Sequence, residues 1–375
     1  MAQQPVVVVG AGPAGLATSH QLTRRGVPHV VLERGDAPGH CWANAYDSLK
    51  LHTGKLMSSL PGLPFPRAYP AFVPRQRFWE YLCAYAERFR LPVETGCRVS
   101  GVGRGNGAWV VTTNRGDITA HALVMATGIM SNPQIPRFPG QERYRGRLAH
   151  SVEYRRAGPY AGRRVLVVGV GNSGAEIASE LGRAGVDVTL AVRSGANVVP
   201  LTMFGLPIQY VSYWVRKLPR AAQDRIVAMV ARLTELRRGP PVLPRPAHSP
   251  LDAIPVIGFH LVDAIKAGLV RVKPGLAELT EDGARFTDGS SGVFDDVILA
   301  TGFAPALDPL GTLVRRDAKG FALRTDRVTS ADQPNLYFVG HNYDATGGLW
   351  NIRVDSRLVA EAISRQPSAV SKGPR

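Results

Sequence analysis

Residues 6–15 read Val-Val-Val-Val-Gly-Ala-Gly-Pro-Ala-Gly, and this short stretch decides the fold. Four consecutive valines are typical of a strand that is buried on both faces. The glycines that follow have the spacing G-x-G-x-x-G and open a segment that predicts a helix to about Arg25. Gly10 permits the tight bend, Gly12 lets a pyrophosphate approach the backbone, and Gly15 lets the helix pack on the strand. The stretch therefore predicts a Rossmann-type unit that binds a dinucleotide at its helix N-terminus.

The next apolar run indicates which ribose this unit accepts. Residues His29–Leu32 predict the neighbouring strand, and Glu33 closes it, 23 residues after Gly10. A carboxylate at this point can accept hydrogen bonds from both hydroxyls of an unphosphorylated ribose. We predict that this first unit binds FAD.

A second copy of the same pattern follows in mid-chain. The strand Val165–Val168 leads into Gly169-Val170-Gly171-Asn172-Ser173-Gly174, and the next strand, Val186–Val192, ends at Arg193-Ser194. An arginine at this point can pair with a ribose 2′-phosphate, which a carboxylate would repel. The second site is therefore predicted to prefer NADPH to NADH, with a solvated surface role for Arg193 as the alternative.

Three further glycine-containing turns follow predicted strands. The triplet Ala-Thr-Gly ends an apolar run twice, at residues 126–128 and 300–302, and a strand over Leu336–Val339 leads through Gly340 to a helix from about Gly348 to Ser364. Small residues at such turns let the chain pass close to a nucleotide.

These elements predict an α/β fold with two Rossmann-like dinucleotide-binding domains, the NADPH domain being inserted in the FAD domain. We expect the FAD domain over residues 1–155 and 296–375 and the NADPH domain over 156–295. A helical, lid-like insertion is expected at about 200–250. Its apolar part, 201–215, is shorter than the roughly 20 residues of a spanning helix. A basic amphipathic helix is expected over 219–238 and a proline-rich connector over 239–250.

Composition and charge indicate which binding partners and which cellular compartment to expect. The formal net charge is +16, but the arginines are scattered and no nucleic-acid module is visible, so nucleic acid is not expected as a partner. A basic surface instead attracts anionic cofactors, and contact of the lid with a membrane surface stays open. The three cysteines form no C-x-x-C pair, and the first residues predict a strand and no signal peptide, so we expect a cytoplasmic protein. Composition alone indicates neither the oligomeric state nor the substrate.

The segment before the second fingerprint carries a family resemblance. Tyr144, Gly146, His150 and Tyr154 match the signature F-x-G-x-x-x-H-x-x-x-Y/F, with tyrosine in place of the first phenylalanine. Together with residues 42–66, 78–86 and 300–303, they make the chain resemble the class B flavin-dependent monooxygenases over roughly residues 1–365, most closely the YUCCA-type enzymes and their bacterial relatives.

The resemblance implies a defined reaction. NADPH would reduce FAD, O₂ would form a C4a-hydroperoxyflavin, and a small organic substrate would take one oxygen atom. That substrate would be a 2-oxo acid such as an indole-3-pyruvate-like compound, or a nitrogen or sulfur nucleophile. The alternatives are a Baeyer–Villiger-type oxygenase, an NADPH oxidase and a non-catalytic flavin-binding redox sensor. The cysteine spacings exclude a disulfide reductase that works through a C-x-x-C or C-x₄-C pair.

The resemblance and the fingerprints together name the candidate site residues. His52 takes the place of an asparagine that faces the flavin in the animal-type members, and it is predicted to be catalytic together with Asn342. His150 is expected to link NADP⁺ binding to domain orientation or to be structural. No metal ligands are expected. The predicted cofactor-binding residues are Gly10, Gly12, Pro13, Ala14, Gly15, Glu33, Arg34, Trp42, His52, Thr53, Val99, Ala126, Thr127, Gly128, Gly169, Gly171, Asn172, Ser173, Gly174, Arg193, Ser194, Thr301, Gly302, Gly340, Leu349 and Trp350.

Overall fold

The first glycine turn lies in a five-stranded parallel sheet. The computed structural model describes residues 4–344 and 346–365, so the other residues of the predicted FAD domain lie outside the described part. The strand order in this sheet is β20-β7-β1-β2-β3, and every neighbouring pair is parallel. The strands are β20 (Leu336–Phe338), β7 (Ala122–Met125), β1 (Val6–Val9), β2 (His29–Leu32) and β3 (Val93–Glu94).

The valines of β1 are buried because both faces of this sheet are covered. Val6 and Val8 pack into a cluster with α1 (Pro13–Thr23), α4 (Arg75–Arg88) and α9 (Gly348–Ser364). Val7 and Val9 point to the opposite face, because successive side chains of a strand alternate. There they meet Trp109 and Val111 of a three-stranded antiparallel sheet, which consists of β4 (Val99–Gly105), β5 (Ala108–Thr113) and β6 (Gly116–Ala120).

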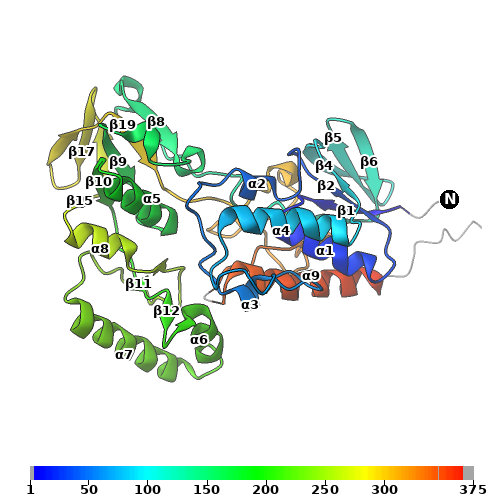
Figure 1. The fold of residues 1–375 in the computed structure, drawn as a ribbon. Coiled ribbons are helices and arrows are strands. Elements are labelled where there is room, and N and C mark those ends of the chain that lie inside the picture. The colour runs from blue at the N-terminus through cyan, green and yellow to red at the C-terminus, as the bar shows by residue number, and fades with distance from the viewer. Residues whose placement is uncertain (1–3, 345, 366–375) are drawn as a thin grey trace, which may run out of the picture.

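A second unit repeats this arrangement. Its parallel sheet has the order β15-β10-β9-β19-β8, with β15 (Val270–Pro274), β10 (Asp187–Val192), β9 (Arg164–Val168), β19 (Asp296–Leu299) and β8 (Arg147–His150). Helices α5 (Asn172–Arg183) and α8 (His260–Lys266) cover one face. A three-stranded antiparallel sheet packs on the other face, with β16 (Leu276–Leu279), β17 (Gly283–Phe286) and β18 (Ser291–Val293). Figure 1 shows the two units side by side.

The predicted domain boundaries need correction. They assign 147–155 and 296–375 to the first unit, whereas β8 and β19 are hydrogen bonded into the second sheet. The reason is that β19 pairs with β9 in the same way as β7 pairs with β1, so the second Ala-Thr-Gly triplet ends a strand of its own unit. The chain therefore crosses between the units before Arg147 and after Leu299.

The lid begins slightly before and ends slightly after the predicted range. Two short strands, β11 (Val198–Val199) and β14 (Val256–Ile257), pair in parallel at its base. Between them lie the hairpin of β12 (Thr202–Met203) and β13 (Leu206–Pro207), then α6 (Ile208–Val215) and α7 (Arg220–Arg238). The prediction of a helix over 219–238 is confirmed, with Pro219 as the residue before its first turn. In the described part of the chain, no helix is long and apolar enough to cross a membrane.

The lid also touches the first unit. Figure 1 shows α6 lying beside α3 (Lys55–Ser58) and the start of α9. The hydroxyl of Tyr210 on α6 accepts the N–H of Leu56 at 3.1 Å, and the ring of Tyr213 lies edge-on to Trp350 at 5.5 Å. The short helix α2 (His40–Ala43) follows the first fingerprint unit and faces α4. The lid thus reaches across both units.

Candidate active site

The two glycine turns have the same backbone geometry. Gly10 has a φ of +101° and Gly169 a φ of +105°, a region that favours glycine. A Cβ atom on Gly15 would lie 1.8 Å from the carbonyl oxygen of Gly10, and a Cβ on Gly174 would lie 2.1 Å from that of Gly169. The first and third glycines of both fingerprints are therefore required by the fold itself.

The middle glycines have a different reason to be glycine. Gly12 and Gly171 have extended backbones, with φ of −74° and −73°, and a Cβ atom on either would meet nothing within 4 Å. Each is the residue before a helix, α1 or α5, and neither helix start is capped by a side-chain hydrogen bond. Uncapped N–H groups at a helix N-terminus beside open space make an anion-binding site. The turns therefore fit two pyrophosphate groups.

A first cavity of about 680 Å³ opens over the first fingerprint, within the size range of cofactor sites. Most of the predicted FAD residues line it, which brings together segments far apart in the sequence. The predicted residues that line it are Gly10, Gly12, Pro13, Ala14, Glu33, Arg34, Trp42, His52, Thr53, Val99, Ala126, Thr127, Gly128, Gly340 and Leu349.

Glu33 is held in place at the end of β2. One carboxylate oxygen accepts the N–H of Ala11 at 2.7 Å, and the other accepts the N–H of Gly35 at 2.9 Å. Glu33 is buried and still lines the first cavity. Each carboxylate oxygen has more than one acceptor site, so ribose hydroxyls can share it with these N–H groups.

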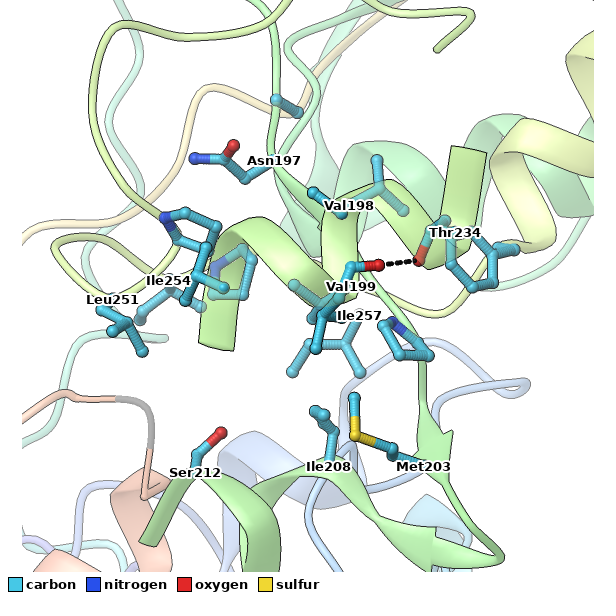
Figure 2. Close-up of a pocket in the computed structure, with 18 of the residues that line it drawn as sticks. Asn197, Val198, Val199, Met203, Ile208, Ser212, Thr234, Leu251, Ile254 and Ile257 are labelled. Atoms are coloured by element: carbon cyan, nitrogen blue, oxygen red, sulfur yellow. Dashed lines mark hydrogen bonds between the residues drawn. The ribbon is translucent and has the colours of Figure 1, made fainter. Parts of the chain in front are cut away.

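A second cavity of about 450 Å³ lies under the lid, and we call it the lid cavity. It is enclosed by α6, α7 and the strands β11 and β14, as Figure 2 shows. Four residues line both this cavity and the first one: His52, Thr53, Tyr343 and Gly348. This shared wall joins the fingerprint cavity to an apolar chamber. The sequence predicted His52 and Thr53 as site residues. It did not predict Tyr343, because no sequence pattern identifies the residues that line the lid cavity.

His52 is paired with a residue that the sequence patterns did not reveal. Its Nε2 atom is hydrogen bonded to the carboxylate of Glu176 on α5, and the hydroxyl of Tyr46 donates to the other oxygen of that carboxylate. Burial raises the pKa of Glu176, but the hydrogen bonds from His52 and Tyr46 outweigh it and hold the pKa below its usual value. Burial and the charge of Glu176 in turn raise the pKa of Tyr46. A carboxylate in the first turns of the second fingerprint helix thus fixes His52 across the two units.

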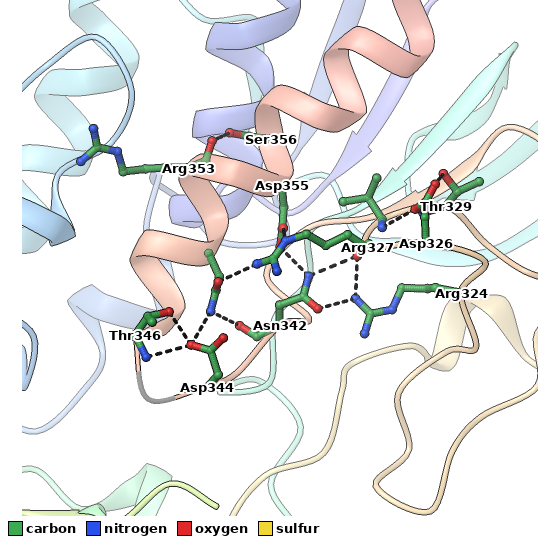
Figure 3. A network of polar contacts seen from close by, with 12 residues as sticks. Arg324, Asp326, Arg327, Thr329, Asn342, Asp344, Thr346, Arg353, Asp355 and Ser356 are labelled. Carbon is green, nitrogen blue, oxygen red and sulfur yellow. Dashed lines mark hydrogen bonds and ion pairs between the residues drawn. The ribbon is translucent and has the colours of Figure 1, made fainter. Parts of the chain in front are cut away.

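The predicted catalytic role of Asn342 does not fit the structure. Figure 3 shows its side chain in a polar network: Nδ2 donates to Asp355 at 2.7 Å, and Oδ1 accepts from Arg324 at 3.0 Å. Burial raises the pKa of Asp355, which also pairs with Arg327 at 2.5 Å. Asn342 lines neither cavity, and its side chain is fully used in joining the loop after β20 to α9.

Trp350 also lies outside both cavities. Its ring packs on Tyr213 of α6, with the guanidinium of Arg353 5.2 Å from the ring centre. The residue therefore anchors the lid to α9 and does not reach the first cavity, where its neighbour Leu349 lies.

The second fingerprint is exposed at its predicted ribose end. Arg193 and Ser194 directly follow β10 and are exposed, and the guanidinium of Arg193 forms no hydrogen bond or ion pair with the part of the chain that the structure describes. Thr301 donates its hydroxyl to Gln134 O at 2.5 Å. Asn172, in contrast, is bound to the lid, since its Nδ2 donates to Pro255 O at 2.9 Å.

His150 is used in structural hydrogen bonds. Its Nε2 donates to the carbonyl of Gly302 at 3.1 Å, and its Nδ1 accepts the N–H of Val152 at 3.2 Å. These two partners fix one neutral tautomer, and burial lowers the pKa of the ring. His150 thus connects the end of β8 to the turn after β19. This favours a structural role for His150 over the alternative role of linking NADP⁺ binding to domain orientation.

Comparison with known proteins relates the chain to flavoproteins. Residues 7–201 match the family described as pyridine nucleotide-disulphide oxidoreductase. The chain is 39% identical to an indole-3-pyruvate monooxygenase, YUCCA1 of Oryza sativa subsp. japonica, over 79% of this chain and 76% of that protein. It is 36% identical to indole-3-pyruvate monooxygenase YUCCA6 of Arabidopsis thaliana, over 96% and 90%. A flavin-containing monooxygenase from Stenotrophomonas maltophilia has a similar structure, with a TM-score of 0.77, 25% identity and coverage of 97% and 99%.

Proposed function

Because the chain belongs to the YUCCA-type flavin-dependent monooxygenases, we propose that it uses NADPH and bound FAD to transfer one atom of O₂ to a small organic substrate. The overall reaction balances as substrate, NADPH, H⁺ and O₂ giving oxygenated substrate, NADP⁺ and H₂O. Reduced flavin supplies the electrons and the O₂ chemistry when it is bound. The protein supplies binding, orientation and exclusion of water.

The first cavity is the proposed FAD site. Gly12 leaves room for the pyrophosphate at the start of α1, and Glu33 lies where a ribose would be held. Trp42, on α2, and Leu349, at the start of α9, line the same space from other directions. Cys41 also lines this cavity, but burial raises the pKa of its thiol, and all three cysteines are free. These free thiols accord with the proposed cytoplasmic location.

The second fingerprint is the proposed NADPH site. Gly171 leaves the same open space at the start of α5, and Arg193 is exposed and free to pair with a 2′-phosphate. We propose that Ser173, in the first turn of α5, adds a donor for the phosphates.

The shared wall is the observation that carries the proposal. His52, Thr53, Tyr343 and Gly348 face both the cavity over the first fingerprint and the apolar lid cavity. A reagent bound in the first cavity would meet a substrate bound in the second only at this wall. An oxygen-transfer enzyme needs this arrangement, because the reactive centre must be sheltered from bulk water and still reach the substrate.

Stopped-flow absorbance of the FAD-loaded protein tests the proposal. We expect NADPH to bleach the oxidised flavin bands, and O₂ then to produce a transient that absorbs in the near ultraviolet before the oxidised spectrum returns. An oxidised spectrum that NADPH leaves unchanged would overturn the proposed function.

A further inference from the structure

Most of the side chains that line the lid cavity are apolar. Helix α7 turns Ile226, Val227 and Val230 toward it, and the strands at its base contribute Val199 and Ile257. Figure 2 shows Val199, Ile208 and Ile257 around an open centre, with the hydroxyl of Ser212 pointing inward from α6. This composition favours a ligand that buries apolar surface and makes few polar contacts.

The cationic side chains that line the cavity are already paired. Arg238 binds Asp263 at 2.7 Å, and its guanidinium lies 4.2 Å from the ring centre of Phe259. Arg245 forms an ion pair with Glu235 of α7, and the ammonium of Lys266 donates to the carbonyl oxygen of Arg238. Among the lining residues that the structure describes, no lysine or arginine is left without a partner.

The polar side chains at the edge of the cavity are also engaged. Gln209 accepts the N–H of Gly54 at 2.9 Å and donates to Thr346 O, so its amide is used at both ends. Asn197 donates to His248 O at 2.8 Å, and Thr234 donates to Val230 O at 2.8 Å. Asp344 lies 3.4 Å from Arg216 and also accepts the N–H of Thr346 at 2.8 Å.

These contacts limit the charge of the substrate. A carboxylate that enters an apolar cavity loses its hydration and needs a free cation or several N–H donors in exchange. We propose that the lid cavity takes an uncharged, largely apolar substrate, with its reacting atom at the shared wall and its apolar part between α6 and α7. The proposal rests on the proposed function and departs from the 2-oxo acid that the family resemblance implies.

A matched pair of ligands tests the charge preference. 4-Phenyl-2-butanone and 4-phenyl-2-oxobutanoate share their ring, chain and ketone and differ in a methyl group against a carboxylate. Calorimetric titration of the FAD-loaded protein with NADP⁺ present is expected to give a Kd at least tenfold lower for the ketone. An equal or lower Kd for the 2-oxo acid, or binding of neither ligand, would overturn the proposal.

A single added cation tests the physical reason for this preference. Val230 lines the lid cavity, whereas its neighbour Met229 is 54% exposed on the other side of α7. We compare the Kd of the 2-oxo acid divided by the Kd of the ketone. Val230→Lys is expected to lower this ratio at least tenfold, because the added cation favours the 2-oxo acid. Met229→Lys is expected to leave the ratio within twofold of its original value. Should Val230→Lys fail to fold, Val227→Lys makes the same test. Equal effects of the inward and outward lysines would contradict the assignment of the cavity.

A different measurement tests the proposed function. Flavin reduction by NADPH is followed without either ligand, so an unreduced flavin overturns the monooxygenase while leaving the binding preference intact. Normal flavin reduction combined with preferred binding of the 2-oxo acid overturns only the substrate class.

Discussion

Asn172 is hydrogen bonded to Ile257: the side-chain oxygen of Asn172 accepts the N–H of Ile257 at 2.9 Å, and its Nδ2 donates to the carbonyl of Pro255 at 2.9 Å. Asn172 follows the middle glycine of the second fingerprint, and Ile257 lies in the base of the lid. The turn that is proposed to hold NADPH is therefore joined directly to a wall of the lid cavity.

Removing this link should loosen the lid base. In Asn172→Ala, we expect hydrogen exchange at residues 254–259 to rise at least fivefold, because the Ile257 N–H loses its acceptor. The fraction of NADPH that ends as hydrogen peroxide should rise with it, since a looser cavity holds substrate poorly. Asn197→Ala is the control, because it removes a different side-chain hydrogen bond of the lid, to His248 O, and leaves both hydrogen bonds of Asn172 in place. Unchanged exchange at 254–259 would show that the link does not restrain the lid.

The glycines of the two turns should respond differently to valine. Gly12→Val should fold and lose FAD, because its Cβ meets no protein atom and would occupy the ligand space. Gly171→Val should keep FAD and raise the Kd for NADPH at least tenfold. Gly15→Val should fail to fold, since its Cβ would lie 1.8 Å from a carbonyl oxygen. Melting temperature and flavin absorbance distinguish these results, and a Gly12→Val protein with full flavin content would contradict the first site.

Arg193 should set the choice between the two nicotinamide cofactors. Arg193→Ala is expected to raise KM for NADPH about tenfold and leave KM for NADH nearly unchanged, because only NADPH carries the 2′-phosphate. Arg271 is a matched control on the neighbouring strand β15, where it pairs with Asp187. Equal changes of KM for both cofactors in Arg193→Ala would remove Arg193 from the 2′-phosphate site.

His341 should make the protein sensitive to acid. It is buried beside Phe321 and Phe338, and both ring nitrogens lack a hydrogen-bond partner. Burial, with the nearby charge of Arg324, lowers its pKa to about 3. Between that value and the ordinary pKa of 6.5, the unfolded chain binds a proton that the folded protein does not, so stability falls as pH falls through this window.

Replacing this histidine should remove the penalty. His341→Phe is expected to raise the free energy of unfolding at pH 5 by about 2 kcal/mol more than at pH 7.5. Chemical denaturation at the two pH values measures this difference. A gain that is the same at both pH values would mean that His341 does not titrate on unfolding in this range.

The local patterns predicted local structure well. Gly10, Gly12 and Gly15 act through neighbours in their own turn, and Glu33 reaches that turn from the adjacent strand, so spacing alone located the first cavity. The membership of β19 in the second sheet was missed because it depends on which parallel neighbour the strand finds. The pair His52–Glu176 spans 124 residues and forms only when the units pack together, which no periodicity records. Asn342 was misplaced for the same reason, since its partners come from α9 and from the loop before β20.

The matching turns at Gly10 and Gly169 have a consequence for how such a protein can change. Their φ angles differ by only a few degrees, and in each unit a strand, the glycine turn and a helix lead in turn to the neighbouring parallel strand. They differ at Glu33 and Arg193, each of which directly follows the strand that pairs with the fingerprint strand and comes after it in the chain, β2 or β10. On the roles proposed for these two residues, a substitution at a strand end would change the choice of cofactor without any change in the glycine turn.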